Sequence, residues 1–276
     1  MARHDPRNIA RYWNDQAMPG LSLMCAQFTT HEFAPHVHDG FVVAATEAGG
    51  AEIKSRGVVG RAQPSTLLAF NPGEPHSGWM GRNTKWCYRA FYVPKSTIDD
   101  LTQSLGTNRP GYFLNNGLSD QHLIGYFLEL HRALEADGDR FRSRELFLSA
   151  FATLFARHAD SGPPPLAPPK DRALLAAACA IMQSRYGEHL LLDDLARDVK
   201  LTPYQLIGLF KRTVSLTPHA YLTQIRLGRA CDHLRKGDAI AHAAAVCGFY
   251  DQAAFTHHFK RCYGITPLQF AKAVTL

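Results

Sequence analysis

The chain has 276 residues, 46% of them hydrophobic, and a formal net charge of +6 at pH 7, and this length predicts two domains because a single core seldom grows so large. No apolar run approaches the roughly 18 residues of a membrane span, and the N-terminus lacks the apolar segment of a secretory signal, so we expect a cytoplasmic protein with no membrane partner. The six cysteines show no C-x-x-C spacing, which argues against a disulfide framework or a cysteine zinc site.

The N-terminal part is predicted to be β-structure. Residues 41–50, 66–78 and 86–94 are short runs rich in β-branched or aromatic residues, separated by Gly, Pro and Asn. This spacing is typical of a small antiparallel barrel.

Two stretches of this part contain histidines. In APHVHDGF, His36 and His38 are two residues apart on an extended segment, so their side chains should point to the same face. In NPGEPHSG, the Pro72-Gly73 pair predicts a turn that brings His76 onto the next strand. Together the stretches resemble the two half-motifs of a cupin barrel, H-x-H and P-G-x-x-H.

Two roles are open for these histidines. Imidazole nitrogens could hold Zn²⁺ or Fe²⁺, and the alternative function is then a metal-binding cupin enzyme or metal sensor fused to a second domain. Cupin enzymes add a Glu that is separated from the second His by three or four residues, but Val42 and Val43 occupy those positions and Glu47 lies further along. The missing carboxylate favours the other role, as residues of the barrel interior or contacts for a small effector.

Aromatic and basic residues on or near the predicted strands add effector candidates. An Arg beside aromatic rings suits a small ligand bearing a carboxylate, whereas the alternative for Trp79 and Tyr92 is an ordinary place in the core or rim. The effector-binding candidates are His36, His38, His76, Trp79, Tyr88 and Arg89.

Two helices are predicted next, at 119–136 and 139–159. In the first, apolar residues recur at a narrow, heptad-like spacing: Leu123, Phe127, Leu130 and Leu134. Such a seam either packs on its own domain or joins two copies of the chain.

A domain boundary is predicted at residues 161–169, SGPPPLAPP, where five of nine residues are Pro and no helix can continue. Residues 1–160 form the first domain and residues 170–276 the second. Residues 1–169 contain 16 Lys+Arg and 16 Asp+Glu, whereas residues 170–276 contain 14 and 8. The whole positive excess therefore lies in the second domain, which we expect to meet a polyanion.

The second domain contains a repeated pattern of two short helices. Thr202-Pro203 predicts the start of a helix over 203–213, and an apolar stripe ends at Val199 just before it, which is a helix-turn-helix arrangement. The pattern returns 49 residues later, with Gly248 at the turn and Asp251 as the cap. A longer helix over 218–237 should set the spacing of the two units.

Each unit ends in a nearly identical sequence, FKRTVSLTP at 210–218 and FKRCYGITP at 259–267. In each, the Phe is predicted to be a core anchor, and Lys-Arg lies at the helix end where cations can reach phosphate. The following Thr-Pro should cap the next helix.

Residues 171–276 closely resemble the AraC/XylS family of bacterial transcription regulators, on the strings LARDVKLTPYQLIGLFKR and GFYDQAAFTHHFKRCYGITP. The resemblance implies seven helices and binding of double-stranded DNA by the second helix of each unit. It also implies an N-terminal effector domain, RNA polymerase as a partner, self-association through the helices after the barrel, and more often activation than repression.

The groove-facing positions follow from that resemblance. In the second unit Gln252, Thr256 and His257 offer base-edge hydrogen bonds, while Ile207 and Gly208 of the first unit offer none. The DNA-binding candidates are Tyr204, Gln205, Ile207, Gly208, Lys211, Arg212, Gln252, Ala253, Thr256, His257, Lys260 and Arg261.

The sequence thus predicts an α+β protein: a cupin-like barrel with two following helices, then an all-α domain of two helix-turn-helix units. The predicted function is a DNA-binding transcription regulator controlled by a small effector. It requires no catalytic residue and no certain cofactor. A rival prediction is a barrel that serves only as a dimer scaffold.

Overall fold

The structure is a computed structural model that describes residues 8–16, 18, 20–104, 111–136, 140–160 and 169–274. The chain divides into two compact units, residues 1–32 with 37–164 and residues 33–36 with 165–276. Strand β3 (Phe33–His36) is described with the N-terminal sheets because its backbone pairs with β8. The predicted linker, 161–169, lies outside the described residues except for Pro169.

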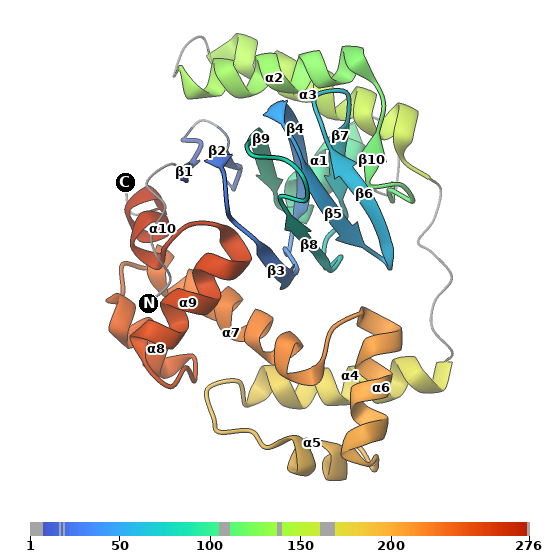
Figure 1. Cartoon of the computed structure of the whole chain (residues 1–276), viewed down its shortest axis with the longest axis vertical. Helices are drawn as coiled ribbons and strands as arrows, with labels where there is room; N and C mark the ends of the chain where they lie inside the picture. Colours follow the sequence, from blue (N-terminus) through green and yellow to red (C-terminus); the bar gives the residue numbers. More distant parts are fainter. Residues whose placement is uncertain are drawn as a thin grey trace. The chain divides into compact units, whose positions relative to one another are not determined.

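Two β-sheets lie in the N-terminal part of the chain (Figure 1). The first has the order β1 (Ile9–Asn14), β2 (Ser22–Phe28), β9 (Trp86–Val93), β4 (Phe41–Gly49), β7 (Leu67–Phe70) and β10 (Gly117–Leu118). The second has the order β3, β8 (His76–Trp79), β5 (Ala51–Ser55) and β6 (Val58–Ala62). The strands predicted at 41–50, 66–78 and 86–94 are confirmed as β4, β7 with β8, and β9.

Helices cover one face of the larger sheet: α1 (Lys95–Ser104), α2 (Gln121–Glu135) and α3 (Arg140–His158). Side chains alternate along a strand, and in β9 Phe91 and Val93 are fully buried in the core that the sheet shares with these helices. The apolar seam of α2 lies in the same core: Leu123, Phe127, Leu130 and Leu134. The seam therefore packs on its own domain, the first of the two alternatives, and offers no surface for self-association.

A buried histidine joins α2 to this sheet. His131 is fully buried, donates from Nε2 to the carbonyl of Met24 (3.1 Å) and accepts at Nδ1 from Arg89 (3.0 Å). Burial, and then the nearby Arg89 charge, lower the pKa of His131 to about 4. The imidazole therefore stays neutral at pH 7, as this pair of hydrogen bonds requires.

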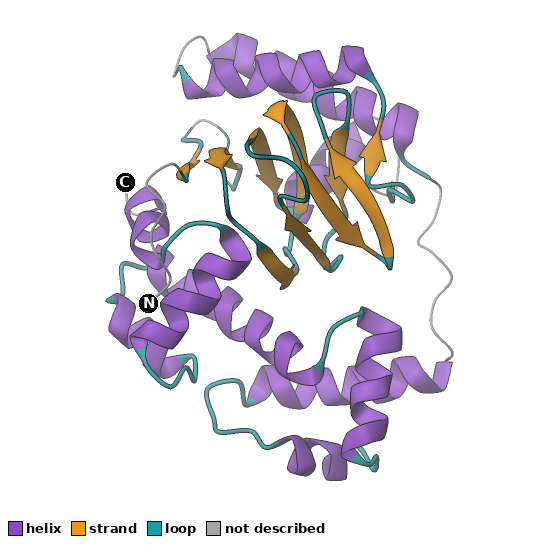
Figure 2. Ribbon diagram, in the orientation of Figure 1, coloured by secondary structure: helices purple, strands orange, loops and turns teal. Residues whose placement is uncertain are grey.

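The C-terminal unit is entirely helical over its described residues 169–274 (Figure 2). Its seven helices are α4 (Pro169–Ser184), α5 (Leu192–Asp198), α6 (Pro203–Val214), α7 (Pro218–Arg235), α8 (Ile240–Val246), α9 (Gln252–Tyr263) and α10 (Pro267–Val274). The α+β fold class and the seven helices are therefore confirmed. No helix in the described parts of the chain is long and apolar enough to cross a membrane.

The sequence repeat corresponds to a repeat of structure. Phe210 of α6 and Phe259 of α9 are both fully buried. The hydroxyls of Thr217 and Thr266 accept backbone hydrogen bonds at the starts of α7 and α10, at 3.1 and 3.2 Å. In both units the shared Phe thus packs in the core, and the shared Thr-Pro begins the next helix.

The turns of the two units differ in one strained residue. Gly248 has φ 78° and Lys200, at the matching place, has φ 57°; this left-handed region costs a residue with a Cβ about 1 kcal/mol or more. We expect Lys200→Gly to raise the free energy of unfolding by about 0.5 kcal/mol, after the entropic cost of glycine in the unfolded chain.

Gly248→Ala is the matched control for this prediction. An added Cβ would lie 2.7 Å from the carbonyl oxygen of Tyr186, so we expect a loss of more than about 1 kcal/mol. Urea unfolding followed by far-UV circular dichroism measures both changes. Destabilisation by Lys200→Gly would show that the turn is not strained at this residue.

Candidate DNA interface and effector site

Helix α9 presents a polar face in the second helix-turn-helix unit. Asp251 caps the helix by accepting from the backbone N–H of Ala254 (2.6 Å). Gln252, Ala253 and His257 are exposed, Thr256 is half-buried, and the opposite face contains the buried Phe255 and Phe259. Because positions i, i+1, i+4 and i+5 share one side of a helix, the structure brings the four predicted groove-facing residues together.

Basic residues and one tyrosine flank this face. Lys260 and Arg261 lie in the last turn of α9, as predicted. Tyr250 is 97% exposed just before the Asp251 cap. The sequence analysis did not single out Tyr250, because no periodicity marks a residue in a turn. Its exposure beside the helix start makes it a further candidate contact.

Helix α6 presents a different surface in the first unit. Thr202 and Gln205 form a capping box, in which the Gln205 Oε1 accepts from the Thr202 backbone N–H (2.9 Å). Ile207 and Gly208 are half-buried and Lys211 is exposed. The Tyr204 side chain lies outside the described part of the structure. The side-chain oxygen of Gln205, a predicted DNA contact, therefore caps its own helix.

Arg212 is engaged within its own unit. Its Nε and Nη2 donate to the two carboxylate oxygens of Asp171 in α4, at 2.6 and 3.0 Å. The Arg212 hydrogen bond also lowers the pKa of the Asp171 carboxyl from its ordinary value. A phosphate contact by Arg212 would require this bidentate pair to open.

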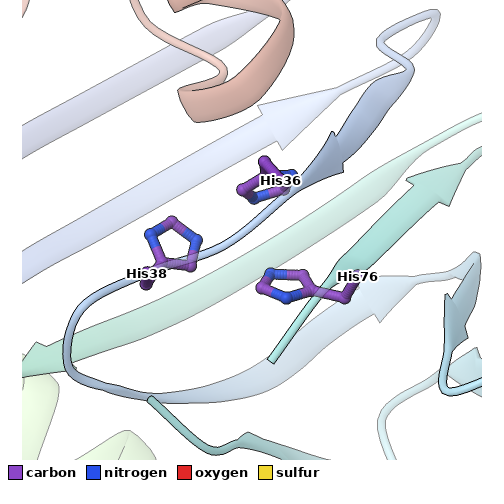
Figure 3. A group of neighbouring side chains, drawn as sticks. All are labelled: His36, His38 and His76. Carbon is purple, nitrogen blue, oxygen red and sulfur yellow. The ribbon is translucent and has the colours of Figure 1, made fainter. Parts of the chain in front are cut away.

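The three predicted histidines form one group (Figure 3). One ring nitrogen of each of His36, His38 and His76 lies within 4.8 Å of the others. His36 and His76 are 4% and 9% exposed, and His38 is half-buried. Burial lowers the pKa of His76 to about 4, despite its hydrogen bond to Glu74, so this imidazole is neutral at pH 7.

Backbone carbonyls fix the orientation of two of these rings. The Nδ1 of His36 donates to the carbonyl of Ala34 (2.8 Å), and the Nδ1 of His76 donates to that of Glu74 (2.9 Å). Phe70 stacks on the His76 ring, with centroids 4.1 Å apart and an interplanar angle of 12°. When such a ring is neutral, its lone pair is therefore on Nε2.

The NPGE stretch holds His76 at the start of β8. Gly73 takes the left-handed conformation at φ 69°, which glycine tolerates. The buried Glu74 carboxylate accepts from Ser55 (2.6 Å) and Asn116 (2.7 Å), and pairs with the Arg56 Nε (3.1 Å). Sequence analysis predicted the turn but missed this role of Glu74, whose partners Ser55, Arg56 and Asn116 lie far away in the sequence.

The other effector candidates lie on two different faces. Tyr88 and Tyr92 share one face of β9 by strand alternation, and the Tyr92 ring lies 5.1 Å from the His38 ring between centroids. Arg89 points to the opposite face, where it pairs with Glu135 and, at 3.0 Å, with Glu47. Trp79 lies three residues after His76 on β8, so strand alternation places the two side chains on opposite faces. The structure therefore does not bring Arg89 or Trp79 together with the histidines.

Comparison with known proteins agrees with this two-part arrangement. Residues 19–151 match the AraC-like ligand binding domain and residues 195–273 match a helix-turn-helix domain. The HTH-type transcriptional regulator YbfI of Bacillus subtilis (strain 168) is 28% identical over 245 residues, which cover 86% of this chain and 87% of that protein. The arabinose operon regulatory protein of Escherichia coli (strain K12) is 24% identical over 280 residues, covering 98% and 94%.

A solved structure shows the same fold. ToxT from Vibrio cholerae O395 aligns with a TM-score of 0.54 at 12% sequence identity, covering 98% of this chain and 99% of that one. A ligand-binding domain followed by a helix-turn-helix domain defines a DNA-binding transcriptional regulator. The chain belongs to the AraC family of these regulators.

Proposed function

We propose that the protein is a sequence-specific transcriptional activator, and that a small effector bound in the N-terminal domain controls its action on DNA. The observation that supports this most is a pair of helix-turn-helix units in one compact unit. The domain containing them, residues 170–276, has 14 Lys+Arg against 8 Asp+Glu, while the preceding domain matches a ligand-binding domain.

The two units are proposed to contribute differently to DNA recognition. Gln252 can pair with adenine, Thr256 can contact thymine, and His257 can donate to guanine. The α6 face has Ile207 and Gly208 at corresponding places, so we assign it mainly apolar contact and positioning. Phosphate contacts are assigned to Lys211, Lys260 and Arg261, with Tyr204, Gln205, Arg212 and Ala253 as additional DNA contacts.

The effector is proposed to contact the face that bears His36, His38 and His76, with Tyr88 on the same side of the sheet as Tyr92. Arg89 and Trp79 are not part of this proposal, because their side chains lie on other faces. The effector must bind one arrangement of the protein more tightly than another, since equal affinity for both shifts nothing. This function needs no nucleophile or general acid.

Further parts of the proposal concern organisation and partners. Residues 161–169 are proposed to link domains 1–160 and 170–276. RNA polymerase is the proposed partner in activation, and the location is proposed to be the cytoplasm. If the protein is a homodimer, it must associate through a surface other than the α2 seam, which is buried in its own core.

Selection of bound DNA from a random duplex pool by the full-length protein tests the proposal. We expect one enriched motif, and an affinity for it that falls steeply with salt because Lys and Arg contacts release counterions. Enrichment of no motif at any salt concentration would contradict sequence-specific binding.

A further inference from the structure

The histidine group has the features of a metal site rather than of three unrelated side chains. His36 and His76 lie on different strands, yet each ring uses its Nδ1 for the backbone carbonyl two residues earlier, at 2.8 and 2.9 Å. Metal-binding histidines are commonly oriented in this way, because a hydrogen bond at one ring nitrogen fixes the tautomer and presents the other nitrogen as ligand. Here that other nitrogen is Nε2 in both rings.

We propose that His36, His38 and His76 bind one divalent transition-metal ion, with Zn²⁺ as the ion of best fit and one coordination position left to water or an anion. The inference does not depend on the proposed control of transcription. A regulator without metal would still bind DNA, and a metal would bind here whatever the DNA site.

The geometry requires only a small adjustment. Tetrahedral Zn²⁺ with Zn–N distances of about 2.0–2.1 Å separates ligand nitrogens by about 3.3 Å, and the three nitrogens now lie within 4.8 Å of one another. His36 and His76 are buried and anchored, whereas His38 is half-buried in the segment between β3 and β4. We therefore expect His38 to move most when the ion binds.

Two carboxylates of this domain, Glu74 and Glu47, pair with other residues. Glu74 accepts from Ser55 and Asn116 and pairs with Arg56. Glu47 pairs with Arg89 (3.0 Å) and Arg132 (2.8 Å). A ligand set of three neutral imidazoles suits Zn²⁺, Fe²⁺ or Co²⁺ and disfavours Mg²⁺ and Ca²⁺, which prefer oxygen ligands.

A second group of suitable side chains provides an internal comparison. His233, Asp238 and His242, from the end of α7 to α8, also have ligand atoms within 4.8 Å of one another. There the His233 Nδ1 already contacts Asp238 Oδ2 at 2.6 Å, and His242 is exposed. A metal that bound at this surface would respond to changes in His242 and not in His38.

The test uses tag-free, full-length protein stripped with a chelator and titrated with Zn²⁺ and with Co²⁺. We expect one ion per chain, visible absorption bands of tetrahedral Co²⁺, and a melting temperature that rises with free Zn²⁺ because only the folded state holds the site. His38→Ala and His76→Gln should each weaken binding by about 100-fold or more, beyond the loss typical of an outer-shell change.

The matched controls are His122→Ala, an exposed histidine of α2, and His242→Ala; both should leave Co²⁺ absorption and Zn²⁺ affinity unchanged. The melting temperature of metal-free His38→Ala should equal that of the metal-free parent, which separates loss of a ligand from loss of the fold. Failure of the parent protein to bind either ion, or loss of binding in His242→Ala with retention in His38→Ala, would overturn the assignment.

Discussion

Replacing Gln252 or His257 with alanine is expected to weaken binding of the full-length protein to its selected DNA site by about 1–3 kcal/mol each, a factor of roughly 5 to 150. Both side chains are exposed on one face of the capped helix α9, where they can reach base edges. The same changes should relax the preference at one or two adjacent base pairs. Titration of each variant on the selected site and on its single-base variants measures both effects.

Lys211→Ala provides the comparison for this prediction. Lys211 is exposed in the last turn of α6, and loss of a phosphate contact should weaken the selected and scrambled sites by similar factors. The slope of log affinity against log salt should then fall by about one unit. If Ile207→Ala relaxed specificity more than Gln252→Ala and His257→Ala, α6 would be the principal base-reading helix and the ranking would be reversed.

Glu74→Gln is expected to lower the free energy of unfolding of the N-terminal domain by about 3 kcal/mol, because it leaves the Arg56 charge unpaired and disturbs the hydrogen bonds of a buried carboxylate. All three tryptophans, Trp13, Trp79 and Trp86, lie in this domain. Urea unfolding followed by tryptophan fluorescence in the full-length protein therefore reports on the domain that contains Glu74.

Glu52→Gln is the matched control for Glu74→Gln. Glu52 lies on β5 and pairs with Arg61 at 3.5 Å, where the Arg61 side chain is 76% exposed. An exposed pair of this kind contributes about 0–1 kcal/mol, so the change should be small. Equal destabilisation by the two substitutions would mean that the Glu74 network does not hold the turn before β8.

The helical unit could be predicted closely because its signals are local. The Thr202-Pro203 cap, the Asp251 cap and the repeated Phe residues each fix a helix within a few residues of themselves. Helix α6 was predicted over 203–213 and spans Pro203–Val214. The Arg212–Asp171 pair could not be predicted, since it joins residues 41 positions apart.

The candidate effector site was predicted only in part. Tyr88 and Arg89 are adjacent on one strand, so alternation places them on opposite faces, and this could have been anticipated once β9 was assigned. By contrast, the Glu74 network depends on residues from several separate segments. The periodicity of α2 likewise predicts an apolar stripe but does not say which surface covers it.

The most direct test of the central claim is base-by-base interference mapping of the full-length protein on its selected DNA site. We predict two groups of essential bases about 10 base pairs apart, since consecutive major-groove faces lie about 34 Å apart on one side of the duplex. In Gln252→Ala and His257→Ala, one group should lose its base preference while the other is retained. A single group of bases, or two groups equally affected by these substitutions, would contradict recognition by two separate helix-turn-helix units with α9 as the principal reader.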